Sequence, residues 1–157
     1  MQREPITPQG HEKLVKEIEH LKHVERPNNI KAIEEARGHG DLSENADYDA
    51  AKQEQGMIQA RLTSLEDRLA RCEVIDPKTL SGKVVMFGAT VTLVDTESDE
   101  HMVYKLLNSY EADAKLKIIS LESPIGKALI GKEEGDEVVV NTPNGARDLA
   151  IVKVEFK

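Results

Sequence analysis

One short stretch of the sequence gathers residues that could do chemistry. The stretch RGHGDLSENADYDAAK, residues 37–52, holds a dense run of carboxylates with no Lys or Arg among them: Asp41, Glu44, Asp47 and Asp49. Asp41 and Glu44 supply the oxygen ligands that hard divalent cations such as Mg²⁺ prefer. Two carboxylates at an exposed turn cannot enclose an ion, so we expect them to complete a metal site whose other ligands belong to a partner.

The same two carboxylates also have a purely structural interpretation. Asp41 and Glu44 have the spacing of a capping box, with Asp41 as the N-cap of the following helix and Glu44 at its third position. Ser43 could be the cap instead, and carboxylates in the first turn of a helix are stabilised by the helix dipole. The capping role and the metal-binding role are compatible, because an exposed cap can exchange its hydrogen bonds for an ion.

Basic residues flank the acidic stretch. Arg37 lies four residues before Asp41 and either pairs with it or brackets a phosphate chain together with Lys52. We interpret His39 as a turn residue rather than a general base. The single cysteine, Cys72, and the histidines lack the spacing of a zinc site; the histidines are His11, His20, His23, His39 and His101.

Two long helices with apolar faces should position this stretch. A Thr7–Pro8 start fits an N-cap followed by proline at the first helical position, and Pro27 predicts a local kink or register change. The first apolar face comprises Leu14, Ile18, Leu21, Ile30 and Ile33, and the pattern stops near Gly38 and Gly40. The second helix begins near residues 42–44, and its apolar face comprises Ala51, Ile58, Leu62, Leu65, Leu69 and Cys72. Two such helices joined by a short turn pack antiparallel, which predicts a coiled-coil hairpin with the acidic stretch at its tip.

The second half of the chain has a different pattern. VIDPKTLSG, residues 74–82, has the composition of a linker, and the alternating, Val- and Thr-rich segments after it predict strands. A turn at residues 143–145 predicts a final hairpin, and SPIGKALIGK predicts one short helix. We therefore predict an α+β protein: an antiparallel coiled-coil domain over residues 1–76, a linker over residues 77–82, and a small antiparallel β-sheet domain with a short helix over residues 83–157.

The composition argues against several classes of protein. The 157 residues carry a net charge of −8 with 39% hydrophobic and 32% charged side chains, which is typical of a folded protein and unfavourable for a broad phosphate-binding surface. No window approaches 18 uninterrupted apolar residues, and the first residues have no signal-peptide core, so we expect no membrane contact. One cysteine cannot form a disulfide within the chain, which fits a cytoplasmic protein.

The sequence around the acidic stretch resembles a known family. The run RPNNIKAIEEARGHGDLSENADYDAAKQEQG resembles the N-terminal coiled coil of the bacterial Gre transcript-cleavage factors, and GDLSENADY is its most specific part. The segments GKVVMFGATVTLVD, SPIGKALIGKEEGDEVVV and TPNGARDLAIVKVEF resemble the C-terminal domain of that family, which has an FKBP-like fold. The resemblance covers essentially the whole chain, and the acidity resembles the GreA branch more than the more basic GreB branch.

This resemblance implies a transcription elongation factor that binds bacterial RNA polymerase and inserts its coiled-coil tip into the secondary channel. There it would stimulate Mg²⁺-dependent cleavage of the 3′ end of nascent RNA in backtracked complexes, so that elongation resumes. Asp41 and Glu44 would hold the Mg²⁺ jointly with the polymerase, and Ser43 would position the tip. The isolated protein would bind no ion stably, would act on no small molecule and would not be an enzyme by itself. The resemblance also implies nascent-RNA contacts by Arg37 and Lys52, and polymerase contacts by Glu122, Ser123 and Pro124.

Two other functions are alternatives. A channel-occupying inhibitor of RNA polymerase would share the fold but carry an altered tip, and the intact GDLSEN motif argues against it. A peptidyl-prolyl isomerase is suggested only by the FKBP-like fold, and fold alone does not carry function. Its pocket needs an aromatic lining, whereas the region after residue 82 has few aromatic side chains: Phe87, Tyr104, Tyr110 and Phe156.

Overall fold

The computed structural model describes residues 3–38 and 45–157, which fall into two compact units. Among the described residues, residues 11–72 belong to the first unit, and residues 3–10 together with residues 73–157 belong to the second. Residues 3–10 therefore belong with the C-terminal part of the chain. None of the helices in the described ranges is long and apolar enough to cross a lipid bilayer.

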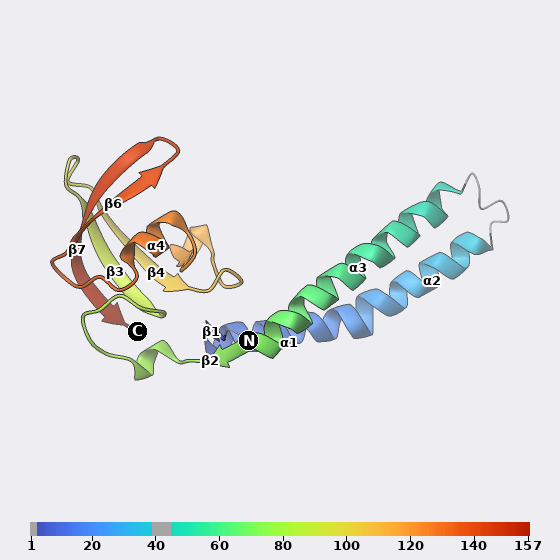
Figure 1. Ribbon diagram of the computed structural model, residues 1–157. Helices are drawn as coiled ribbons and strands as arrows, with labels where there is room; N and C mark the ends of the chain where they lie inside the picture. Colours follow the sequence, from blue (N-terminus) through green and yellow to red (C-terminus); the bar gives the residue numbers. More distant parts are fainter. Residues whose placement is uncertain (1–2, 39–44) are drawn as a thin grey trace. The chain divides into compact units, whose positions relative to one another are not determined.

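The first unit is a hairpin of two antiparallel helical arms (Figure 1). The incoming arm consists of α1 (Pro8–His20), the π-helical segment η1 (Leu21–Glu25) and α2 (Arg26–Arg37), and the returning arm is α3 (Ala46–Arg71). Helix α1 begins as predicted, because Thr7 Oγ1 accepts a hydrogen bond of 3.0 Å from the Gly10 N–H.

A narrow apolar core joins the two arms. With the exception of Ala36, its buried side chains belong to the two faces that the sequence predicted: Leu14, Ile18, Leu21, Ile33 and Ala36 from the incoming arm, and Ala51, Ile58, Leu62 and Leu65 from α3. Leu69 and Cys72, at the end of the predicted seam, are half-buried. Burial of one leucine side chain contributes roughly 2 kcal/mol, so this seam is the main source of stability of the hairpin. The predicted coiled-coil hairpin is confirmed.

The π-helical segment η1 changes which residues of the incoming arm face α3. The Arg26 N–H donates to the Leu21 carbonyl, five residues back, and Pro27, which has no N–H to donate, follows immediately. One extra residue in a turn rotates the helix beyond it by about 100°. Asn29 is consequently 3% exposed and Ile30 is 45% exposed. The predicted register change at Pro27 is confirmed, and the prediction that Ile30 belongs to the core face is wrong.

Two short strands that are far apart in the sequence form a two-stranded sheet. Strand β1 (Glu4–Ile6) pairs with β2 (Cys72–Val74), and the Ile75 N–H donates to the Ile6 carbonyl at 2.8 Å. The segment with the composition of a linker thus starts as the end of a strand and continues into the short 3₁₀ helix η3 (Pro77–Thr79). Ile6 itself is fully buried.

A five-stranded sheet forms the body of the second unit, in the order β5-β4-β3-β7-β6. The strands are β3 (Ala89–Asp95), β4 (His101–Leu107), β5 (Ile118–Ser120), β6 (Glu137–Thr142) and β7 (Gly145–Phe156). All pairs are antiparallel except β4 and β5, which are parallel, so the sheet is mixed rather than antiparallel as predicted. The chain turns back through η4 (Ala114–Leu116) before β5 begins, which gives β5 the direction of β4. The predicted α+β class is confirmed.

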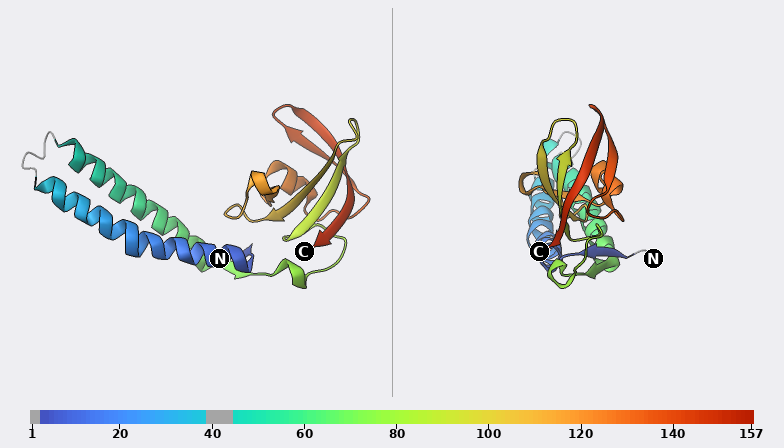
Figure 2. Two further views of the ribbon diagram at one scale, coloured as in Figure 1. Left: turned by 180° about the vertical axis from the view of Figure 1, so that it is seen from behind. Right: turned by 90° about the vertical axis from the view of Figure 1, so that its left-hand side faces the viewer.

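The sheet is strongly curled, and helix α4 (Pro124–Leu129) lies against it (Figure 2). A change of register between Thr92 and Leu93 interrupts the pairing of β3 with β7, and such irregularities bend a strand. The predicted final hairpin is present, with residues 143–144 as its turn. The core comprises side chains from the strands, from α4 and from the segment before β3: Val85, Ala89, Val91, Leu93, Leu106, Leu129, Val138, Val140, Leu149, Ile151 and Val154.

Asp95, at the end of β3, is expected to make the second unit sensitive to acid. The hydrogen bond from the Glu97 N–H, followed by those from the Ser98 N–H and Arg147, lowers the pKa of Asp95, although burial opposes the shift. A carboxyl group whose pKa is lower in the folded state stabilises the fold above its unfolded pKa. This stabilisation is lost as the pH falls through the folded pKa. We expect Asp95→Asn to lower the midpoint of urea unfolding at pH 7. The difference in midpoint between the parent and the variant should become smaller between about pH 5 and pH 3.

The matched control is Asp99→Asn, which removes one charge from the same turn. Asp99 has a positive φ of 60°, a conformation that asparagine also tolerates. If the difference in urea midpoint between the parent and Asp95→Asn stays constant over this pH range, the prediction is wrong.

Candidate functional site

The predicted site falls in the stretch of sequence that connects the two arms of the hairpin. Helix α2 ends at Arg37 and α3 begins at Ala46. Asp41, Ser43 and Glu44, with the predicted turn residue His39, fall outside the described residues. The structure therefore describes the end of α2 and the start of α3, which flank the acidic stretch. Side-chain hydrogen bonds connect these two helix ends.

Asn45 connects the two helix ends. Its side chain is 8% exposed, its Oδ1 accepts a hydrogen bond of 3.0 Å from the Tyr48 N–H, and its Nδ2 donates to the Ala36 carbonyl. The first contact caps α3, and the second satisfies a carbonyl in the last turn of α2. One buried side chain thus fixes the spacing of the two arms next to the acidic stretch.

The position of this cap corrects the structural interpretation of the acidic stretch. Asp41 and Ser43 were the predicted N-caps of the second helix, but the cap is Asn45, which has extended backbone angles of φ −87° and ψ 94°. The helix therefore starts later than predicted. Since Asn45 satisfies the Tyr48 N–H, α3 does not need either tip carboxylate as its N-cap.

A second buried asparagine lies further along the hairpin. Asn29 Nδ2 donates to the Ala51 carbonyl at 2.9 Å, so α2 and α3 are joined by a side chain at this level as well. The neighbouring positions are small, and a hollow of about 340 Å³ is lined by Ala32, Glu35, Ala36, Asp47, Ala50, Ala51 and Glu54. Within residues 3–38 and 45–157, no group of three His, Cys, Asp or Glu side chains is arranged to hold a metal ion.

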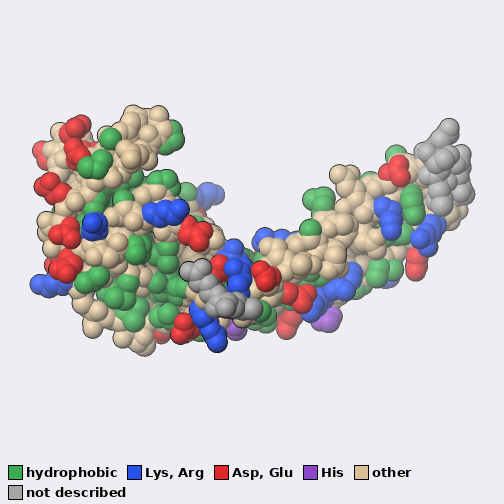
Figure 3. All heavy atoms as spheres, viewed as in Figure 1, with side chains coloured by type: hydrophobic (Ala, Val, Ile, Leu, Met, Phe, Trp, Pro, Cys, Tyr) green, Lys and Arg blue, Asp and Glu red, His purple; other side chains and the backbone are tan. Residues whose placement is uncertain are grey.

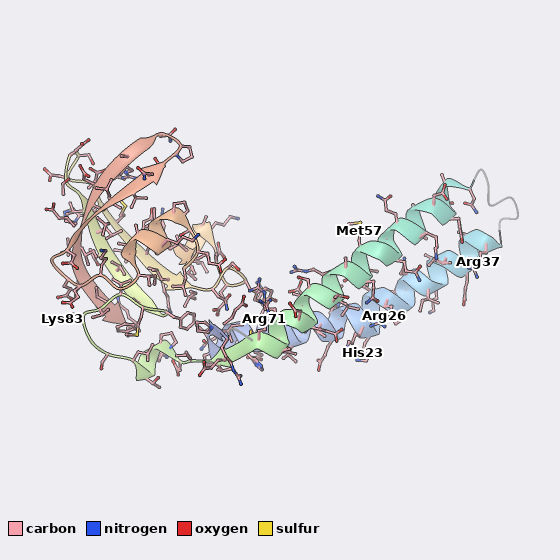
Figure 4. All side chains as sticks on the ribbon, viewed as in Figure 1. His23, Arg26, Arg37, Met57, Arg71 and Lys83 are labelled. Carbon is pink, nitrogen blue, oxygen red and sulfur yellow. The ribbon has the colours of Figure 1, made fainter. Side chains whose placement is uncertain are left out.

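The two predicted RNA contacts lie on opposite arms near the tip. Arg37, in the last turn of α2 (Figure 4), is exposed. Its guanidinium carbon lies 6.0 Å from the centre of the Tyr48 ring. Lys52 is exposed on α3, and its Nζ donates to Gln55 Oε1 at 2.9 Å. Contact with Tyr48 limits the conformations of Arg37, whereas the bond of Lys52 is a surface contact that a ligand could displace. A role in RNA binding stays a prediction for both residues.

The predicted polymerase contacts lie where the chain enters α4 in the second unit. Ser123 caps α4: its Oγ accepts from the Gly126 N–H at 3.0 Å and donates to the Ser120 carbonyl at 2.7 Å. Glu122 and Pro124 are exposed on either side of it. The hydroxyl of Ser123 is therefore used within the fold, which leaves the Glu122 carboxylate and the Pro124 ring as the groups available to a partner.

The chemistry of the donor set fits Mg²⁺. Asp41 and Glu44 offer carboxylate oxygens, the ligand type that Mg²⁺ prefers, and the ion commonly takes one or two carboxylates together with water and phosphate oxygens. Two carboxylates leave most of its six positions to other donors. A metal-binding role for Asp41 and Glu44 stays a prediction, because both residues fall outside the described part of the chain.

Comparison with known proteins identifies relatives over the whole chain. A family model described as the N-terminal domain of transcription elongation factors matches residues 4–74, and the model of the C-terminal domain of GreA/GreB transcription elongation factors matches residues 80–156. The transcription elongation factor GreA of Hyphomonas neptunium is 52% identical over 157 residues, which are 100% of both chains. That of Rickettsia felis is 52% identical over 98% of this chain and 94% of its own.

A crystal structure of GreA factor homolog 1 from Thermus thermophilus is 32% identical and covers 98% of this chain and 99% of that chain, with a TM-score of 0.45. The family models and the GreA proteins agree over both halves of the sequence. The chain belongs to the GreA/GreB family of transcription elongation factors.

Proposed function

We propose that this chain binds bacterial RNA polymerase and stimulates the polymerase to cleave the 3′ end of nascent RNA in backtracked complexes. In this proposal Asp41 and Glu44 donate carboxylate oxygens to a Mg²⁺ ion in the active centre of the polymerase. The chain is not an enzyme by itself, because it contributes only part of a metal site. It works in the cytoplasm, where bacterial transcription takes place.

The two side-chain hydrogen bonds of Asn45 are the observation that supports this proposal best. Asn45 bonds to the Ala36 carbonyl and the Tyr48 N–H, so both helix ends are held together directly beside Glu44. A ligand that must enter another protein's active site gains affinity when it is held in place beforehand. The cap of α3 is already supplied, so coordination of an ion by the two carboxylates does not cost the helix its N-cap.

The helical arms give the tip its reach. Helix α3 has 26 residues, which correspond to a length of about 39 Å. A narrow hairpin of this length is suited to entering a channel, and we propose the secondary channel of the polymerase. Near the tip, Arg37 and Lys52 approach the RNA phosphates, while Glu122 and Pro124 contact the polymerase with Ser123 holding their turn in shape.

The bound Mg²⁺ would stabilise charge that develops on the reacting phosphate and activate the attacking water. The carboxylates of this chain add negative charge that holds the ion, and Ser43 positions them. Exposed like charges repel weakly in water, so an acidic tip costs the free protein little. The same charge becomes favourable once it faces a divalent cation.

The proposal predicts shortening of backtracked RNA. An elongation complex with a displaced 3′ end and 5′-labelled RNA is incubated with this chain at constant Mg²⁺. We expect the labelled RNA to lose its 3′ segment and elongation to resume when nucleotides are added. RNA of unchanged length, together with slower elongation, would contradict the proposal and favour an inhibitor that occupies the channel.

A further inference from the structure

A surface on the incoming arm carries features that the proposed cleavage function leaves unused. At the junction of η1 and α2, an open hollow of about 530 Å³ is lined by six residues, which we call the junction face: Lys22, His23, Arg26, Pro27, Ile30 and Lys31. His23 and Arg26 come from this arm, whereas Met57 belongs to α3 (Figure 4). The junction face lies wholly within the hairpin.

The floor of the junction face is apolar. Pro27 is exposed and Ile30 is 45% exposed, because the extra residue in η1 rotates Asn29 rather than Ile30 into the hairpin core. Val24, one turn before Pro27, is 44% exposed. Neighbouring exposed apolar side chains with a polar rim are typical of interaction surfaces, and π-helical segments often occur at functional sites.

The rim of the junction face is basic, although the chain carries a net charge of −8. Lys22, Arg26 and Lys31 are cationic, and Glu25 is the one carboxylate in the sequence between residues 22 and 31. Lys22 Nζ lies 3.7 Å from Glu66 of α3, which is a loose surface pair. Along the lower edge of the hairpin, Lys, Arg and His side chains are visible among Asp and Glu side chains (Figure 3).

Arg26 presents a donor without a partner. Its Nε is buried and has no hydrogen-bond acceptor among the described residues. Buried donors are nearly always satisfied in native structures, and the planar guanidinium fork matches a carboxylate. Arg26 also lines the hollow, so the junction face offers a cationic group beside its apolar floor.

We propose that the junction face is a docking surface for an acidic polypeptide segment of RNA polymerase that also carries an apolar side chain. Carboxylates of that segment pair with Arg26 and Lys31, and the apolar side chain covers Pro27 and Ile30. This inference rests on the proposed function, because the polymerase is the partner. A nucleic acid fits less well, since none of the six lining residues is Phe, Tyr or Trp and an apolar floor does not bind phosphate.

The test compares two double variants, each of which replaces one large apolar side chain by serine and one lysine by glutamate. Ile30→Ser with Lys31→Glu alters the junction face, and Met57→Ser with Lys16→Glu alters exposed residues elsewhere on the hairpin, where Met57 is 66% exposed and the Lys16 side chain 71%. Affinity is measured for core polymerase without nucleic acid and for backtracked complexes, and cleavage is measured at saturating factor. We expect the first variant to bind both partners about 10-fold more weakly, a change of about 1.4 kcal/mol, with unchanged cleavage at saturation.

Each contrary outcome has a distinct meaning. Equal affinities of the two double variants would overturn the docking surface alone, provided that the parent chain binds and promotes cleavage. Weaker binding of the first variant only when extruded RNA is present would assign the junction face to nucleic acid and overturn the protein partner. A parent chain that neither binds polymerase nor promotes cleavage would overturn the proposed function and this inference together.

Discussion

Replacement of Asp41 or Glu44 by alanine is expected to lower the rate of transcript cleavage by at least about 100-fold, with affinity for the polymerase nearly unchanged. A carboxylate that holds a catalytic metal ion stabilises the transition state by several kcal/mol, and about 2.7 kcal/mol corresponds to 100-fold in rate. The measurement is single-turnover cleavage in backtracked complexes at saturating factor. Raised Mg²⁺ should restore part of the rate, because a site with fewer ligands binds the ion more weakly.

The folding of both variants should be almost normal. The cap of α3 comes from Asn45 rather than from Asp41 or Glu44, so we expect the free energy of unfolding to change by less than about 0.5 kcal/mol. Asp49→Ala is the matched control, since it removes one exposed carboxylate from the first turn of α3 and should leave cleavage near the parent rate. Tip variants that cut as fast as Asp49→Ala would show that the metal role is wrong.

Asn45→Ala is expected to damage both stability and cleavage. It removes the α3 cap and the side-chain hydrogen bond to the Ala36 carbonyl, which together should lower the free energy of unfolding by roughly 1–3 kcal/mol. We also expect cleavage at saturating factor to fall by about 10- to 100-fold, because small displacements of a catalytic group are costly. Thermal unfolding and single-turnover cleavage measure the two effects.

Asn29→Ala separates positioning from general destabilisation. It removes a comparable buried hydrogen bond, to the Ala51 carbonyl, further from the tip. We expect it to lower stability to a similar extent but to leave cleavage at saturating factor within about twofold of the parent. Asn45→Ser, which retains a capping oxygen, should recover part of the rate. Equal losses of cleavage in the two alanine variants would assign Asn45 a purely structural role.

The sequence predicted the hairpin well because its strongest signal is periodic. Leu62 and Leu65 recur at helical spacing and are both buried, and such spacing depends only on the geometry of the helix. Ile30 was misplaced because the π-helical turn before it adds one residue, and hydrophobic spacing alone cannot show where a helix is overwound or underwound. Pro27 was the signal in the sequence that the helix changes register. The direction and size of that change depend on backbone hydrogen bonds, which cannot be read from a sequence.

The candidate site was predicted only in part. Asp41 and Glu44 stood out by charge, whereas Asn45, which holds the helix ends, was overlooked although asparagine is a preferred N-cap. Several residues in the run DLSEN can cap a helix, and the choice among them depends on the donor to Ala36 on the other arm. In the sheet domain, local alternation predicted the strands, but the parallel pairing of β4 with β5 depends on the path of the intervening turn.

The pairing of the first residues with the C-terminal unit has a consequence for how the protein is made. Asn108 donates to the Pro5 carbonyl, and Glu111 accepts from Thr7, across sequence separations of 103 and 104 residues. Ribosomes add about 5–20 residues per second, so the first strand waits several seconds after its synthesis for these partners. Loss of the first ten residues, by proteolysis or a late start codon, would therefore damage the unit that is synthesised last.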